Sequence, residues 1–264
     1  MWPPSQNGEP MTSQPTRTTS LLSPLTLRTD LPREVATHYW ANQHAAKVIK
    51  LPNLQEYNQR LLSTTDHGYW PATPAVGTAI PEDFRVDGFA EIRFSSVPSI
   101  LATSLHSREV MLDEQNVFGR VLGQITAPGG GRWWTNGFDD AVGHHTALLV
   151  RRRQGVRRPS FRKFVHDKLG RALLSAGVKD LRTYTFLPYT ALVNNSPGVA
   201  HDYPAQHRYH GVVLFGTDHR AAVDELFEHA AIIAVVEQQH TAVSAVHAYT
   251  VERTVPVIRT GTRS

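Results

Sequence analysis

A chain of 264 residues is long enough to bury a substantial core without help from disulfides or metals. It contains no cysteine, which excludes a disulfide framework, a thiolate nucleophile and a cysteine-ligated metal site. The net charge of +4 and the charged fraction of 19% do not by themselves indicate nucleic-acid binding, so we expect no nucleic-acid partner.

The N-terminal region carries no pattern for export or membrane insertion. It lacks the basic-then-apolar order of a signal peptide, and the longest apolar run in the chain, residues 230–236, is far too short to span a membrane. We therefore expect a cytoplasmic protein with no membrane partner. Residues 1–20 are rich in Pro, Ser, Thr and Gln, a composition that predicts a flexible tail.

The next segment, residues 21–126, predicts a first half built from strands and helices. Apolar residues at a spacing of two indicate strands, and apolar residues at helical spacing indicate helices. The predicted order is strand 21–27, helix 32–50, strand 54–63, strand 86–94, helix 98–118 and strand 120–126. Residues 127–143, which contain three consecutive glycines, predict a linker.

A second half over residues 144–252 repeats this order and precedes a C-terminal tail at 253–264. The predicted elements are strand 145–152, helix 159–175, strand 180–187, strand 209–215, helix 218–239 and strand 242–252. A shift of 127 residues pairs Leu54 with Leu181 and Tyr57 with Tyr184. Such a duplication is typical of one pseudo-symmetric body, so differences between the halves indicate where chemistry lies.

The order of elements also predicts the fold class. Each half should form an antiparallel four-stranded sheet with both helices on one face, which leaves the other face to be covered. We expect an α+β fold in which two ferredoxin-like halves pack sheet against sheet as an internal dimeric α/β barrel. Because duplication within one chain supplies the symmetry, we expect a monomer with an internal pseudo-dimer.

Residues 31–126 resemble a known family through four groups of side chains. These are Tyr39-Trp40 with His44; Leu51-Pro52-Asn53-Leu54 with Tyr57 and Gln59; Asp87-Gly88 with Ala90-Glu91 and Phe94; and Asp113-Glu114 with Asn116 and Phe118. On these residues the segment resembles the EthD-type members of the dimeric α/β-barrel superfamily, and the second half matches in outline. The resemblance implies binding of a small hydrophobic molecule. It also implies a chemistry among dehydratases, cyclases, isomerases and cofactor-independent oxygenases.

Comparison of the halves selects His44 and Glu91 as candidate catalytic residues. The repeat aligns His44 with Arg171 and Glu91 with Leu214, so two groups able to move protons are confined to the first half. A histidine and a carboxylate at one cavity supply a general acid and base near neutral pH. Two alternatives stay open: a structural ion pair between Glu91 and its strand neighbour Arg93, and a His44 that is hydrogen-bonded at a helix end.

Further residues near this pair predict a substrate pocket. The candidates are Tyr39, Trp40, Tyr57, Trp70, Phe89, Arg93 and Asn116. The period of two places Phe89 and Arg93 on the strand face of Glu91, which we expect to line the barrel interior. Ordinary core or lid packing is the alternative for the aromatic residues, and a helix-end hydrogen bond is the alternative for Asn116.

Two other groups of residues suggest ligands that we do not predict. A basic run resembles a phosphate-binding patch: Arg151, Arg152, Arg153, Arg157, Arg158, Arg162 and Lys163. Strand alternation should scatter its first three members, so we interpret it as a solvated surface. His201, His207 and His210 have no companion carboxylate motif, and we predict no metal site. Haem would need an axial histidine, and none of His44, His166 and His247 lies in a recognisable ligand motif, so we expect no cofactor.

With His44 and Glu91 as candidates, the resemblance implies an acid/base lyase or cyclase of secondary metabolism. The expected reaction is dehydration or cyclisation of a small hydrophobic secondary metabolite, aromatic or polyketide-like, with His44 and Glu91 as the proton-transfer pair. Two alternatives stay open. One is a cofactor-independent oxygenase of a phenolic substrate, and the other is a non-catalytic small-molecule binding protein.

Overall fold

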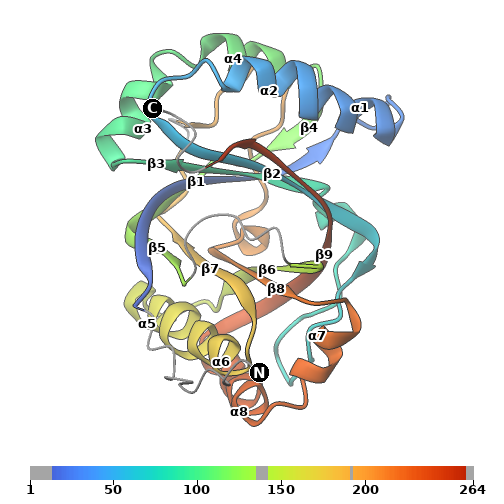
Figure 1. The fold of residues 1–264 in the computed structure, drawn as a ribbon, viewed down its shortest axis with the longest axis vertical. Helices are drawn as coiled ribbons and strands as arrows, with labels where there is room; N and C mark the ends of the chain where they lie inside the picture. Colours follow the sequence, from blue (N-terminus) through green and yellow to red (C-terminus); the bar gives the residue numbers. More distant parts are fainter. Residues whose placement is uncertain (1–13, 135–141, 191–192, 260–264) are drawn as a thin grey trace, which may run out of the picture.

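The protein is a closed barrel of antiparallel strands with helices on its outside (Figure 1). The structure is a computed structural model and describes residues 14–134, 142–190 and 193–259. Within these residues nine strands form one sheet in the order β3-β2-β9-β6-β8-β7-β5-β1-β4. Pairing of β1 with β3 closes eight of them into a barrel, and β4 extends β1 outside the ring. The expected α/β barrel is confirmed.

The strands take the following bounds in the described chain. They are β1 Thr16–Leu27, β2 Leu54–His67, β3 Gly88–Phe94, β4 Phe118–Val121, β5 Gln124–Trp133, β6 His144–Arg152, β7 Lys179–Phe186, β8 Gly211–Thr217 and β9 Val243–Ile258. The first-half strands lie in the order β2-β3-β1-β5, and the second-half strands lie in the corresponding order β7-β8-β6-β9. Two seams, β5 with β7 and β2 with β9, join these groups.

Helices cover the outer faces of the barrel. The α-helices are α1 Arg33–Tyr39, α2 Ala45–Val48, α3 Val97–Ser104, α4 Arg108–Glu114, α5 Arg158–Lys163, α6 Gly170–Ser175, α7 Ala221–Leu226 and α8 Ala230–Gln238. A π-helical turn joins α1 to α2 at Trp40–His44, and another joins α5 to α6 at Phe164–Leu169. In Figure 1, α1 to α4 lie at one end of the view and α5 to α8 at the other, with the barrel between them.

Two predicted helices are each divided into two shorter helices, and the described residues also contain three short 3₁₀ turns. The predicted helix 98–118 separates into α3 and α4, and 218–239 separates into α7 and α8. The Ser96 hydroxyl accepts a hydrogen bond from the Ser99 amide and caps the start of α3. The 3₁₀ turns are Glu82–Phe84, Ala205–His207 and Gln239–Thr241.

Three predicted boundaries are wrong because the strands run further than composition suggests. Thr16 to Ser20, placed in the flexible tail, belong to β1, and the rest of that tail up to residue 13 lies outside the described residues. Residues 127–133, placed in the linker, belong to β5, and 253–258, placed in the C-terminal tail, belong to β9. In each case backbone pairing with a neighbouring strand supplies hydrogen-bond partners that composition does not reveal.

The core has separate layers inside and outside the ring of strands. The interior contains apolar side chains such as Leu62, Phe89 and Leu149. One outer layer lies between the first-half helices and their strands, where Val48, Leu54 and other apolar residues pack. A larger outer layer lies under α5, α6 and α8. Because alternate residues of a strand face opposite sides, each strand contributes to both an inner and an outer layer.

Candidate active site

A cavity of about 310 Å³ lies between the first-half helices and the outer face of their strands. Its walls are mainly aliphatic and aromatic and include Leu54, Ile92 and Phe118. A small set of polar side chains also lines it: Ser23, His44, Tyr57, Thr103, Ser104, Ser107, Glu114 and Asn195. A concave, largely apolar site with a few polar groups is typical of small-molecule binding.

His44 reaches this cavity from the π-helical turn between α1 and α2, and Asp113 holds its ring in place. His44 Nδ1 lies 2.9 Å from Asp113 Oδ2, and both side chains are buried. The ring also packs edge-on against Phe118, with centroids 5.3 Å apart. π-helical turns are frequent at functional sites, and this one places Trp40 and His44 together on the buried side of the helix.

Asp113 is an anion held by four donors. Tyr39 Oη donates to it at 2.7 Å, Lys47 Nζ at 2.6 Å and Asn116 Nδ2 at 3.0 Å, in addition to His44. Burial alone would raise the pKa of Asp113, but these hydrogen bonds outweigh it and hold the pKa well below its usual value. An ionised carboxylate only accepts hydrogen bonds, so His44 Nδ1 must carry the ring proton.

This tautomer leaves His44 Nε2 as a base. Burial lowers the pKa of His44, and the hydrogen bond and charge of Asp113 oppose this effect without cancelling it. The ring is therefore neutral near pH 7. Nε2 makes no hydrogen bond to any residue within the described ranges, and its lone pair is available to a molecule in the cavity.

Glu114 supplies a second proton-transfer group at the same cavity. Burial raises the pKa of its carboxyl group, while the Ser196 hydroxyl, which donates to Oε2, partly opposes the shift. A carboxyl group with a raised pKa retains its proton closer to neutral pH and can act as an acid. Glu114 follows Asp113 directly in the sequence, so consecutive residues at the end of α4 provide the orienting anion and the acid.

Comparison with known families finds a similarity over the part of the chain that contains this site. Residues 28–116 match the EthD domain. This part of the chain is similar to the EthD domain. His44, Asp113 and Glu114 all lie within the matched residues, which also contain most of the side chains around the cavity. The resemblance seen in the sequence is thereby confirmed.

Solved structures show the same fold at low sequence identity. A proposed monooxygenase from Lactobacillus acidophilus NCFM matches with a TM-score of 0.52 at 10% identity, covering 92% of this chain and 98% of that chain. A second, from Fusobacterium nucleatum subsp. nucleatum, matches with a TM-score of 0.51 at 6% identity, covering 90% and 94%. These likenesses concern the fold alone. No curated protein matches the sequence.

The prediction that Glu91 shares a cavity with His44 is wrong. Alternation along β3 turns Ala90 and Ile92 towards the cavity of the EthD domain and Glu91 into the barrel. Glu91 Oε2 accepts from Arg60 Nη2 at 2.9 Å, and Oε1 accepts from Arg182 Nη1 at 3.0 Å. Burial alone would raise the pKa of Glu91, but these two cations lower it to about 2. Glu91 therefore belongs to a buried ion cluster, but its partners are Arg60 and Arg182 and not Arg93, which lies 3.8 Å from Glu56 Oε2.

Of the predicted substrate-binding residues, two line the cavity of the EthD domain and two support it. Trp40 and Tyr57 line the cavity. Burial raises the pKa of Tyr57 to about 12, so its hydroxyl stays protonated near neutral pH. Tyr39 and Asn116 instead hydrogen-bond to Asp113 and so act on His44 through that carboxylate.

The other three predicted substrate-binding residues lie away from this cavity. Trp70 is buried under the second-half helices, where its Nε1 donates to Gln239 Oε1 at 2.8 Å. Phe89 and Arg93 point into the barrel, as strand alternation predicts, and Arg93 stacks over the ring of Trp133. Their assignment to the site was wrong because the cavity lies on the outer face of β3, under the helices.

Three of the candidate metal or haem ligands, His166, His201 and His247, have other partners. Both ring nitrogens of His166 lie within hydrogen-bonding distance of threonine hydroxyls, and those of His201 lie close to backbone carbonyls. His247 Nδ1 lies 2.7 Å from the Tyr209 hydroxyl. Across the described residues, no group of three or more His, Asp or Glu side chains is placed to hold a metal ion. No helix within the same residues is long and apolar enough to cross a membrane.

Proposed function

We propose that this protein is an acid/base lyase or cyclase that acts on a small hydrophobic, aromatic or polyketide-like molecule in the cavity of its EthD domain. The observation that carries the proposal is the His44–Asp113 pair at the wall of an apolar cavity that also contains Glu114. In this proposal Glu114 takes the role that the sequence assigned to Glu91.

The first step is removal of a proton from carbon. His44 Nε2 takes a proton from a carbon next to a carbonyl group, and the C–H electron pair moves into an enolate. Asp113 stabilises the imidazolium that forms, because the carboxylate lies 2.9 Å from Nδ1. Trp40 Nε1 is buried at this cavity and has no hydrogen-bond partner in the described structure. It is the proposed donor to the substrate oxygen.

The second step uses the proton held by Glu114. In a dehydration, the enolate electrons form a carbon–carbon double bond, and the departing hydroxyl takes the Glu114 proton and leaves as water. In a cyclisation, the same enolate carbon attacks a second carbonyl of the substrate, and Glu114 protonates the new alkoxide. Both reactions balance without an added cofactor, and each positioned acid or base typically contributes about 10²–10⁴-fold in rate.

A second candidate shares the first step. The fold likeness to two proposed monooxygenases supports a cofactor-independent oxygenase, in which His44 deprotonates a phenolic substrate that then reacts with O₂. The two candidates differ in their need for oxygen. Turnover under anaerobic conditions supports the lyase or cyclase, and stoichiometric O₂ consumption supports the oxygenase.

We also interpret the barrel as two ferredoxin-like halves. The matching strand orders β2-β3-β1-β5 and β7-β8-β6-β9 support this interpretation. We place the proton-transfer site in the first half and propose that the chain functions as a monomer. Sedimentation equilibrium at micromolar concentration tests the monomer, and an obligate dimer would contradict it.

The proton-transfer proposal can be tested before the natural substrate is known. 2-Tetralone is a small hydrophobic carbon acid, and its α-protons exchange in D₂O at a rate that NMR measures. We expect the protein to accelerate this exchange and His44→Ala to reduce the acceleration at least about 10²-fold. His38→Ala is the matched control, because His38 is exposed on the same helix. If the parent protein binds 2-tetralone without accelerating its exchange, it is a non-catalytic binder. If His44→Ala accelerates exchange as much as the parent does, His44 is not the base.

A further inference from the structure

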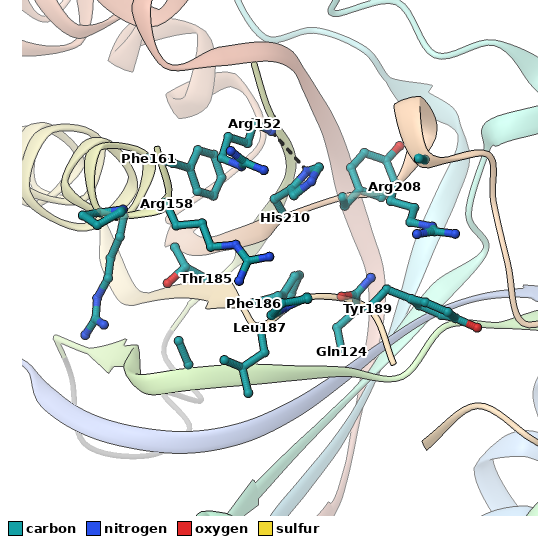
Figure 2. Close-up of a pocket in the computed structure, with 16 residues that line it drawn as sticks. Gln124, Arg152, Arg158, Phe161, Thr185, Phe186, Leu187, Tyr189, Arg208 and His210 are labelled. Carbon is teal, nitrogen blue, oxygen red and sulfur yellow. Dashed lines mark hydrogen bonds between the residues drawn. The ribbon is translucent and has the colours of Figure 1, made fainter. Parts of the chain in front are cut away.

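A second cavity, of about 420 Å³, lies where the two halves meet, away from the EthD cavity (Figure 2). It is bordered by the start of α5, the end of β7 and the segment before β8. Phe161, Phe186 and Tyr209 provide aromatic walls, and Gln124 of β5 reaches it from the first half. Its size and apolar walls fit a small organic molecule.

The cavity has a basic lining without acidic residues. Arg152, Arg158, Arg162 and Arg208 line it together with His210, and none of its lining residues in the described chain is Asp or Glu. The basic run was expected to form a solvated surface. Instead, the turn that follows β6 brings Arg158 and Arg162 of α5 back beside Arg152.

Three of the four arginines already have partners. Arg208 pairs with Asp202 at 2.6 Å and stacks over Tyr189. Arg162 Nη2 donates to the Gly129 carbonyl at 2.5 Å, and Arg152 Nη1 donates to the Val156 carbonyl. These contacts hold the three side chains in place around the cavity.

Arg158 is the cation available to a ligand. It forms no hydrogen bond or ion pair with any residue of the described chain. In Figure 2 its side chain points into the cavity, between His210 and Phe186. An unpaired guanidinium presents a planar fork of N–H donors, which matches the oxygens of a phosphate or carboxylate.

His210 adds a neutral donor beside these cations. Its Nδ1 accepts a hydrogen bond from the Arg152 amide at 3.3 Å, so the ring proton lies on Nε2. Burial, together with the charges of Arg152, Arg158, Arg151 and Arg208, lowers the pKa of His210 to about 4. The neighbouring cations thus keep the ring uncharged and create a positive potential that no lining carboxylate offsets.

We propose that this cavity binds an organic anion whose apolar body packs against Phe161, Phe186 and Tyr209 and whose phosphate or carboxylate group pairs with Arg158. The site is separate from the proton-transfer site, since the two cavities have no lining residue in common. The proposal therefore does not depend on the function assigned to His44.

Three probes with one common ring system test this proposal by calorimetry. 1-Naphthyl phosphate, 1-naphthoate and 1-naphthol differ in charge and share their apolar body. We expect the two anions to bind and the neutral alcohol to bind at least about 10-fold more weakly. Tighter binding of the phosphate identifies a dianionic phosphate ester as the ligand class, and tighter binding of the carboxylate identifies an organic acid.

Arg158→Gln and Arg157→Gln form a matched pair of variants. Both remove one positive charge from neighbouring exposed positions, but only Arg158 lines the cavity. We expect R158Q to weaken binding of the preferred anion about 10-fold or more and R157Q to change it less than about 2-fold. His44→Ala should leave this binding unchanged. Equal effects of R158Q and R157Q, or no anion binding up to millimolar concentration, would overturn the proposal.

Discussion

Replacing Asp113 by Asn tests the role of the carboxylate in directing the His44 proton. Asn keeps the shape of the side chain but loses the charge. Its Oδ1 can still accept from Tyr39, Lys47 and Asn116, which places its Nδ2 where Oδ2 now lies 2.9 Å from His44 Nδ1. The amide then donates to Nδ1, so the ring proton must move to Nε2. His44 would present a donor to the cavity instead of a base.

The geometry sets the expected size of this effect. Loss of the correct tautomer should reduce 2-tetralone exchange by about 10²–10⁴-fold. The substitution also weakens two charge-assisted contacts, one to buried His44 and one to Lys47, whose side chain is 26% exposed. Discounting the contact to Lys47 for its exposure to solvent, we expect a loss of about 2–4 kcal/mol in the free energy of unfolding.

Three measurements on the Asp113→Asn protein separate these effects. NMR of 2-tetralone in D₂O gives the exchange rate, ¹⁵N NMR of the His44 ring gives the tautomer, and urea denaturation gives the stability. Asn116→Ala is the control, because it removes one donor to Asp113 and retains the charge. It should keep exchange within a few-fold. The reasoning is refuted if folded D113N exchanges 2-tetralone within a few-fold of the parent rate.

Three further predictions concern the barrel and its packing. Arg182→Met removes the cation shared by Glu56, Glu91 and Asp180 and should lower the free energy of unfolding in urea by about 3–5 kcal/mol. The control Arg171→Met, on an exposed helix face, should lower it by less than about 0.5 kcal/mol. The pKa of Glu91 is about 2 in the folded protein, against a reference value of 4.5. Its contribution to the free energy of unfolding is therefore complete above pH 4.5 and is lost as the pH falls towards 2. A free energy of unfolding that stays constant over this window would contradict the ion cluster. Gly88→Ala would place a Cβ 2.5 Å from the Arg60 carbonyl oxygen and 3.0 Å from the Trp40 ring. We expect a loss of about 1–3 kcal/mol in the free energy of unfolding and weaker binding of 2-tetralone by calorimetry. Unchanged affinity would show that Trp40 does not shape the cavity.

The sequence predicted which residues form helices and strands better than it predicted which face of a strand borders the cavity. Helical spacing located the helix that carries His44, and a period of two correctly turned Glu91 into the barrel interior. It did not show that the cavity would form under the helices, on the opposite face of β3. The partner of His44 is Asp113, 69 positions away on α4, and that pairing is set by helix packing, which periodicity does not encode.

The strand ends were mispredicted for a different reason. Composition placed the glycines after Ala127 in a linker, yet Gly131 lies in β5 against β1. A Cβ at Gly131 would lie 2.2 Å from Thr18 Oγ1, so glycine is what allows these two strands to approach. A glycine that permits close strand pairing and a glycine in a flexible connection look alike in the sequence. The distinction depends on a neighbour that is more than 100 positions away.

The seam between β2 and β9 has a consequence for how the chain is made. Arg60 of β2 donates to Thr254 of β9 across a separation of 194 residues, so β9 is synthesised long after the strand with which it pairs. Contacts this distant in sequence form late and slow the overall folding reaction. Until β9 arrives, nascent β2 and β6 each have an unpaired edge able to recruit another strand. Exposure of those two edges before β9 pairs with them favours aggregation of the incomplete chain over folding.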